Sequence, residues 1–195
     1  MTFIKIIMKK LLLISLSAII FSCTTEVKEE LNAVNNEAAF NNNVQTFMDF
    51  TTAFGEEDID GVMNLFADSA LWSPPEYNSY EWLSKDELKI ALTNYMNAFD
   101  NLKFTPGINL PGGNLVDGFW GGSRYRSDGN ENTSSLSSSN PNNIRVYGTW
   151  SSTHTESGKE TFSKWYAIVN FNDSGKIVRF NDWFNVDGLQ VQINQ

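Results

Sequence analysis

Residues 161–184 constrain the fold more than any other stretch of this sequence. They contain two β-rich runs, Thr161–Phe171 and Lys176–Phe184, on either side of an Asn-Asp-Ser-Gly segment at 172–175. Asn, Asp and Gly tolerate the positive φ that a tight turn requires. The stretch therefore predicts a long antiparallel hairpin.

The two arms of this hairpin each carry a row of side chains on one face, because side chains alternate across a strand. In the second arm the carboxylate of Asp182 lies in an otherwise apolar row. A buried acid costs free energy unless it is paired or useful, so this face is the first place to look for a functional site. The rows are Ser163, Trp165, Ala167, Val169 and Phe171, and Val178, Phe180, Asp182 and Phe184.

The N-terminal segment has the features of an export signal. Residues 1–10 carry three lysines, and residues 11–21 form an apolar run that is too short to span a bilayer but has the usual length of a signal core. Residues 20–23 (Ile-Phe-Ser-Cys) resemble a bacterial lipobox, which implies cleavage before Cys23 and lipidation of that residue. The alternative is an incidental cysteine in a signal peptide that is cut elsewhere.

We therefore expect a signal peptide at 1–22, an acidic tether at 23–39 and one α+β domain at 40–195. The segment at 28–30 (Lys-Glu-Glu) resembles the acidic export signal of some surface lipoproteins. The protein is thus expected to be lipid-anchored in the bacterial envelope, at the outer membrane or cell surface.

The charge balance excludes a nucleic-acid partner. The full chain has a formal net charge of −9, and removal of residues 1–22 leaves 11 basic and 23 acidic side chains, a net charge of −12. Phosphate binding requires a cationic patch. Attachment to a membrane would therefore depend on the lipid at Cys23.

Metal and cofactor sites have little support in the sequence. Cys23 is the only cysteine and His154 the only histidine, which excludes disulfides within the chain, thiol-ligated metals and histidine clusters. His154 lies in a predicted turn, where exposure is the default. The acidic run 56–60 lacks the spacing of a calcium loop. We expect no cofactor and no metal.

The remaining elements follow from periodicity. Apolar residues at three- and four-residue spacings predict a long helix over 40–54, and a shorter helix is expected at 58–66. A strand at 70–73 should end at Pro74, and Ser84 with Glu87 has the spacing of a capping box that opens a third helix. A Gly/Ser/Asn-rich loop is expected at about 107–143, a strand at 144–153 and a short closing strand at 189–193.

This order of elements resembles the nuclear-transport-factor-2-like, or SnoaL-like, superfamily. The motifs that carry the resemblance are D-I-D-G-V-M-N-L-F-A-D-S-A-L-W at 58–72 and W-Y-A-I-V-N-F-N-D-S-G-K-I-V-R-F-N-D-W-F at 165–184. The resemblance covers about residues 40–189. It implies a cone-shaped α+β domain, in which a curved antiparallel sheet wraps around the long first helix, with two further helices and a pocket at the wide end.

The resemblance also tests one reaction. Steroid isomerases of this superfamily use a Tyr, a buried acid and an Asp base, and the motif register puts Phe50, Ala167 and Pro74 at those positions. None of these side chains can donate or accept the required proton, so steroid-isomerase chemistry is not expected. The same register implies a pocket lined by Phe50, Trp72, Tyr77, Trp165, Ala167, Phe180 and Phe184.

Two roles stay open for Asp182. SnoaL-like cyclases use a pocket acid as a base that removes a proton α to a carbonyl without metal or cofactor, and Asp182 is the candidate catalytic residue for such a step. Alternatively, it is a structural acid held by neighbouring Tyr, Trp or Asn groups. The aromatic cluster of Trp72, Tyr77, Tyr80 and Trp82 is either a stacking rim for a ligand or part of a homodimer contact.

Three hypotheses about function follow. The first is a lipid-anchored protein that binds a small, largely apolar molecule without turning it over. The second is a cofactor-independent cyclase, isomerase or hydrolase that uses Asp182 as general base. The third is an interaction or dimerisation module whose cone is filled by its own aromatic side chains.

Overall fold

The computed structural model describes residues 31–109, 115–116, 118–122 and 140–195. The chain divides into two units, residues 1–36 and residues 37–195. Of the first unit only residues 31–36 are described, and they are helical. Cys23, the expected signal peptide and the motif at 28–30 lie outside the described residues, as does most of the predicted Gly/Ser/Asn-rich loop.

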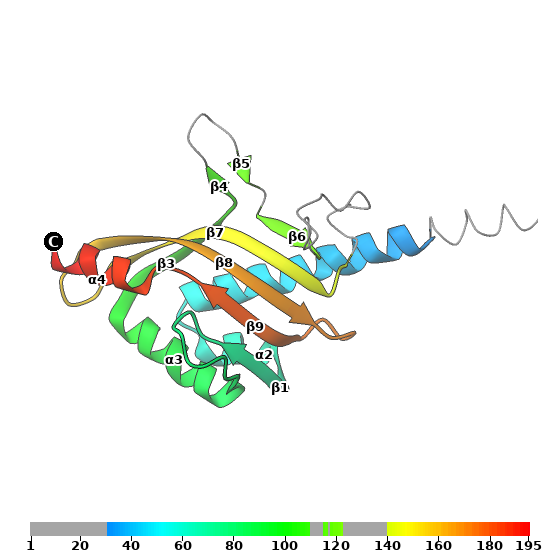
Figure 1. Cartoon of the computed structure of the whole chain (residues 1–195), viewed down its shortest axis with the longest axis horizontal. Coiled ribbons are helices and arrows are strands. Elements are labelled where there is room, and N and C mark those ends of the chain that lie inside the picture. The colour runs from blue at the N-terminus through cyan, green and yellow to red at the C-terminus, as the bar shows by residue number, and fades with distance from the viewer. Residues whose placement is uncertain (1–30, 110–114, 117, 123–139) are drawn as a thin grey trace, which may run out of the picture. The chain divides into compact units, whose positions relative to one another are not determined.

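The second unit begins with a helix over residues 37–55, close to the predicted range. Its face toward the sheet is aromatic, with Phe40, Phe47, Phe50 and Phe54 all buried. The helix α2 (Ile59–Asn64) follows, and the carboxylate of Asp58 caps it by accepting a hydrogen bond of 2.9 Å from the backbone N–H of Gly61. The curved sheet arches over the first helix (Figure 1).

The helix α3 (Lys85–Ala98) starts with the capping box predicted from the sequence. The hydroxyl of Ser84 accepts from the backbone N–H of Glu87 at 3.3 Å, and the Glu87 carboxylate accepts from the backbone N–H of Ser84 at 2.7 Å. These bonds lower the pKa of Glu87. Leu88 and Met96 are buried on one face of this helix.

Over the described residues the main sheet contains seven strands, with β2, β1, β9, β8, β7 and β3 in that spatial order and β6 paired to β7. Their bounds are β1 (Phe66–Ser73), β2 (Leu83–Ser84), β3 (Phe99–Pro106), β6 (Phe119–Gly121), β7 (Asn143–His154), β8 (Glu160–Phe171) and β9 (Ile177–Trp183). A separate two-stranded sheet joins β4 (Ile108–Asn109) to β5 (Leu115–Val116). The predicted loop thus contains short strands.

The predicted hairpin is confirmed as β8 and β9. At its turn the backbone N–H of Asn172 donates to the Lys176 carbonyl at 3.0 Å, and Gly175 adopts a φ of 73°. The expected α+β architecture with a curved sheet is confirmed as well. The sheet is mixed rather than wholly antiparallel, because β1 pairs with β9 in parallel, with Trp72 opposite Phe180.

The C-terminal segment differs from the prediction. Residues 189–193 were expected as a closing strand, but they belong to the helix α4 (Val186–Asn194). The Asn185 side chain caps this helix by accepting from the Gly188 backbone N–H at 2.9 Å. Leu189 and Ile193, four residues apart, pack against the domain on one helical face, so a 3.6-residue period describes this segment better than alternation.

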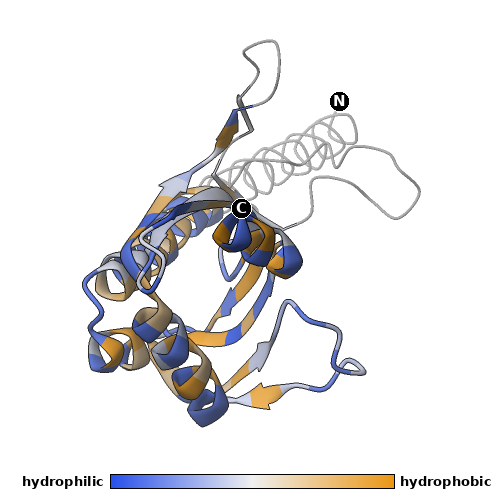
Figure 2. Ribbon diagram, turned by 90° about the vertical axis from the view of Figure 1, so that its left-hand side faces the viewer, coloured by the Kyte–Doolittle hydropathy of each residue, from blue (hydrophilic) through white to orange (hydrophobic). Residues whose placement is uncertain are grey.

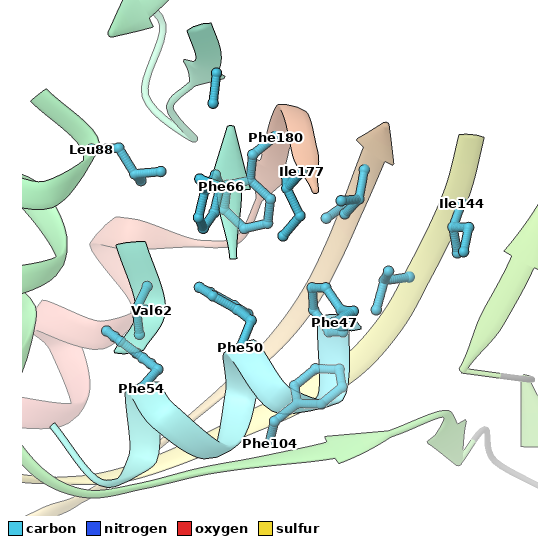
Figure 3. Close-up of a cluster of buried hydrophobic side chains, with 14 of the residues drawn as sticks. Phe47, Phe50, Phe54, Val62, Phe66, Leu88, Phe104, Ile144, Ile177 and Phe180 are labelled. Carbon is cyan, nitrogen blue, oxygen red and sulfur yellow. The ribbon is translucent and has the colours of Figure 1, made fainter. Parts of the chain in front are cut away.

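The core lies between the first helix and the concave face of the sheet. Figure 3 shows Phe47, Phe50 and Phe54 on the helix, close to Phe66 of β1 and Phe180 of β9. Along the strands, hydrophobic and hydrophilic residues alternate (Figure 2), as expected for a sheet with one buried face. None of the helices in the described part of the chain is long and apolar enough to span a bilayer.

Candidate functional site

The position of Asp182 follows from the order of three neighbouring strands. β9 lies between β1 and β8, and Asp182 of β9 is paired with Ala167 of β8. Trp165 is two residues before Ala167 and shares its inward face, while Trp72 of β1 lies opposite Phe180, two residues before Asp182. Side chains that are diagonal neighbours on one face can reach each other. Both indoles therefore flank the carboxylate, one from each side.

Each oxygen of Asp182 accepts a hydrogen bond from one indole. Trp72 Nε1 donates to Oδ1 at 3.0 Å, and Trp165 Nε1 donates to Oδ2 at 3.1 Å. Asp182 is only 6% exposed. The two bonds fix the plane of the carboxylate and leave each oxygen with further acceptor capacity.

Burial controls the acidity of this carboxyl group. The pKa of Asp182 is raised to about 6. Desolvation is the largest cause, the hydrogen bonds from Trp72 and Trp165 act in the opposite direction, and the charge of the nearby Glu76 carboxylate adds to the increase. Burial also raises the pKa of Tyr95, with the charges of Asp182 and Glu76 acting in the same direction. The Tyr95 phenol is therefore neutral near pH 7. Asp182, with a pKa of about 6, changes its charge just below that pH.

These groups border a cavity of about 280 Å³. Its walls come from the first helix, α3, the concave face of the sheet, the segment after β1 and the start of α4. Most of the lining is aromatic or aliphatic. The lining residues are Phe50, Phe54, Trp72, Pro75, Glu76, Ala91, Leu92, Tyr95, Leu102, Trp150, Ser152, Thr161, Ser163, Trp165, Phe180, Asp182, Phe184 and Leu189.

The aromatic walls meet at steep angles. The rings of Trp150 and Trp165 are perpendicular, with centroids 6.4 Å apart, and Phe54 meets Trp150 at 84° and 5.4 Å. Phe50 packs against Phe180 with centroids 5.5 Å apart. Edge-to-face contacts of this kind hold the rings in fixed positions. The cavity therefore has a defined shape.

Six of the residues proposed from sequence line this cavity: Phe50, Trp72, Trp165, Phe180, Asp182 and Phe184. The other two proposed pocket residues do not. Ala167 is fully buried on the concave face of the sheet, where its short side chain is part of the hydrophobic core. Tyr77 is 79% exposed and packs edge-on against Tyr80, since the loop after Pro75 turns it toward solvent.

Several lining residues were not proposed from the sequence. Trp150 shares the inward parity of Ile144 and Val146 along β7, so alternation could have identified it. Tyr95 lies on α3, and nothing local in the sequence shows that this helix borders a cavity. Glu76 follows the second proline after β1, and no sequence signal places it at the site.

The other candidate groups lie elsewhere. His154 ends β7, where its Nδ1 shares a hydrogen bond of 2.9 Å with the Ser157 hydroxyl, and it does not line the cavity. Among the described residues, no three or more His, Cys, Asp or Glu side chains are grouped so that they could hold a metal ion. The motif register places Phe50, Pro74 and Ala167 at the steroid-isomerase positions, and none of these side chains can act as an acid or a base.

The outer face of the sheet carries a second aromatic set. Trp183, which is 41% exposed, stacks on Tyr166 with centroids 5.1 Å apart, and Tyr166 lies 4.9 Å from Tyr147. Arg179 lies over the Trp82 ring at 5.6 Å. Tyr147, Tyr166, Arg179 and Trp183 point away from the cavity, because they alternate with the inward row on β7, β8 and β9.

An α+β domain whose curved sheet packs against helices defines the structural class, and solved structures share this fold. A Bacillus subtilis protein provisionally assigned as an isomerase has a TM-score of 0.58 at 14% identity, over 80% of this chain and 95% of that chain. A Xanthomonas campestris protein provisionally assigned as a polyketide cyclase has a TM-score of 0.55 at 10% identity, over 80% and 98%.

An NTF2-like protein of unknown function from Burkholderia pseudomallei has a TM-score of 0.52 at 21% identity, over 79% of this chain and 98% of that chain. No protein-family model and no curated protein matches the sequence. Identities this low bear on the fold alone. The chain has the nuclear-transport-factor-2-like fold, as its sequence motifs predicted.

Proposed function

We propose that this protein binds a small, largely apolar organic molecule in the aromatic cavity. The observation that carries the proposal is the cavity of about 280 Å³ between the first helix and the sheet, lined mostly by aromatic and aliphatic side chains around one buried carboxylate. Ligand pockets typically combine apolar walls with a few convergent polar groups. The volume lies near the lower end of the usual range of roughly 300–1,000 Å³, which favours a small ligand.

Two of the polar groups in the lining are suited to orient such a ligand. Asp182 offers acceptor oxygens, and the neutral phenol of Tyr95 offers a donor. Tyr95 lines the cavity from α3. The Tyr95 donor and the Asp182 acceptor, in an otherwise largely apolar cavity, are sufficient to orient a bound molecule.

A cavity-filling variant tests the proposal. Ala91 lines the cavity from α3, whereas Ile90, its neighbour on the same helix, is 62% exposed. Ala91→Phe should abolish the change in tryptophan fluorescence that a panel of small apolar molecules and lipids produces in the wild type. Ile90→Phe adds a similar ring outside the cavity and should bind as the wild type does.

Two results would contradict this proposal. Equal binding by Ala91→Phe and wild type would place the ligand outside the cavity. No response by the wild type across a broad panel would leave the interaction-module hypothesis as the better account.

A second candidate function is proton transfer by Asp182. With a pKa of about 6, this carboxyl group is roughly nine-tenths ionised at pH 7 and lies where a base is most effective. The two indole donors orient it toward the cavity, and the Tyr95 phenol could stabilise charge on a carbonyl oxygen. The provisional isomerase and cyclase assignments of the structural neighbours favour the same class of chemistry.

Hydrogen–deuterium exchange measures this activity without a known substrate. The wild type should accelerate exchange at the activated carbon of 2-acetylcyclohexanone, and Asp182→Asn should lose that acceleration by at least about a hundredfold. Equal exchange by wild type and variant would leave Asp182 with a binding or structural role only.

We also propose that the domain is attached to the bacterial envelope through acylated Cys23. The charged start, apolar run and lipobox-like residues 20–23 support this localisation. Cys23→Ser should move the protein from the membrane fraction to the soluble fraction. Continued retention in the membrane fraction would exclude acylation at this residue as the anchor.

A further inference from the structure

The charged side chains around the cavity all have one sign. Asp182 and Glu76 are the only charged residues in the lining, and no Lys, Arg or His of the described chain contributes to it. The protein as a whole is acidic, with a net charge of −9. The electrostatic potential in the cavity is therefore negative, which favours cations and disfavours anions.

Asp182 has no cationic partner in the part of the chain that the structure describes. Both ion pairs among the described residues, Lys85 with Asp68 and Lys89 with Asp60, lie elsewhere. The indole donors of Trp72 and Trp165 satisfy one site on each oxygen but bring no positive charge. A buried carboxylate without a counter-charge is costly, and a bound cation would supply that charge.

The aromatic walls suit the same kind of ligand. A cation over an aromatic face is attracted by the ring quadrupole, and Trp gives the strongest interaction. Phe54, Trp150 and Trp165 all line the cavity, and the Trp150 ring lies at 90° to that of Trp165 and at 84° to that of Phe54. Several aromatic side chains around one cavity are the usual means by which proteins recognise quaternary ammonium groups.

From these three observations we propose that the ligand is an organic cation, a small protonated or quaternary amine with an apolar body. Its nitrogen lies among the aromatic walls, close to Asp182, and Glu76 attracts it at the exposed edge of the cavity. This inference rests on the proposed binding function and makes its ligand class specific.

A charge series of molecules with one shape provides the test. Choline, 3,3-dimethylbutan-1-ol and 3,3-dimethylbutanoate share a branched head but are positive, neutral and negative. Their affinities for the wild-type domain can be measured by calorimetry and by tryptophan fluorescence. We expect choline to bind at least about tenfold more tightly than the alcohol, and the carboxylate to bind most weakly.

The outcomes separate the two proposals. If the alcohol binds as tightly as choline, the cation inference is wrong while binding in the cavity stands. If none of the three binds but other apolar molecules do, the cation inference is again overturned. If the broad apolar panel also gives no response, the proposed binding function fails with it.

Variants locate the charge effect. Glu76→Gln, at an exposed position that should tolerate the change, should reduce the preference for choline over the alcohol about two- to threefold, and Asp182→Asn should reduce it about tenfold. Asp173→Asn alters the net charge equally but lies in the distant turn between β8 and β9, and it should leave the preference unchanged. An equal loss in Asp173→Asn would attribute the preference to net charge rather than to the cavity.

The pH dependence gives an independent readout, because choline itself does not titrate. The titratable groups that border the cavity are Asp182, Glu76 and Tyr95, and burial keeps Tyr95 neutral. Choline affinity should rise as pH increases through about 6, where Asp182 ionises, and alcohol affinity should not. A choline affinity that is constant from about pH 5 to about pH 8 would contradict a role for Asp182.

Discussion

Replacement of Asp182 by Asn should change how the stability of the domain depends on pH. Asn resembles the protonated carboxyl group in size and in having one acceptor oxygen, but it cannot ionise. In the wild type the pKa of Asp182 is about 6 in the folded state, against an ordinary value of 3.8. The folded state therefore binds the proton more tightly than the unfolded state does.

The sign and size of the effect follow from this difference. Between these two pKa values the folded state holds more protons, so the stability of the wild type falls as pH rises. Each tenfold change in acid dissociation is worth about 1.4 kcal/mol, so the full loss is about 3 kcal/mol. Between about pH 4.5 and about pH 7.5 it amounts to about 2 kcal/mol.

Urea unfolding of both proteins at each pH provides the assay. The unfolding free energy of Asp182→Asn minus that of the wild type should rise by about 2 kcal/mol over this range, because groups common to both proteins cancel. The exposed control Asp173→Asn should show no such rise. A constant difference for Asp182→Asn would show that burial does not perturb this carboxyl group, and a falling difference would show that the two indoles stabilise its ionised form.

Two further predictions concern the frame around the cavity. Gly148→Ala should destabilise the domain by about 1–3 kcal/mol in urea unfolding, because the added Cβ would lie 2.3 Å from two ring atoms of Phe104; an unchanged midpoint would contradict this tight contact. Ser84→Ala should cost about 0.5–2 kcal/mol by removing the cap of α3, and the thermal midpoint should fall, whereas Thr93→Ala within the same helix should have a smaller effect.

Elements with local signals were predictable from the sequence. The turn at 172–175 and the Ser84–Glu87 capping box each depend on residues within four positions of one another, and both form as expected. The inward row that contains Phe180 and Asp182 follows from alternation alone. Local chemistry and a period of two thus place the carboxylate on the concave face.

Long-range pairings were not predictable in the same way. The bond from Trp72 to Asp182 spans 110 residues and depends on β1 lying parallel to β9. No residue type specifies that pairing, because the connection between these strands passes through five other strands of the main sheet. The role of Tyr95 depends likewise on where α3 packs. The C-terminal segment was misassigned because Leu189, Val191 and Ile193 fit alternation as well as a helical face.

The most direct test of the account is a heteronuclear NMR titration of the six indole N–H groups. As choline or 3,3-dimethylbutan-1-ol is added, the resonances of Trp72 and Trp165, which donate to Asp182, should shift together with that of Trp150. The resonance of Trp183 on the outer face should remain in place. Shifts confined to Trp82 and Trp183 would place the ligand on the outside of the sheet and contradict the claim that the Asp182 cavity is the binding site.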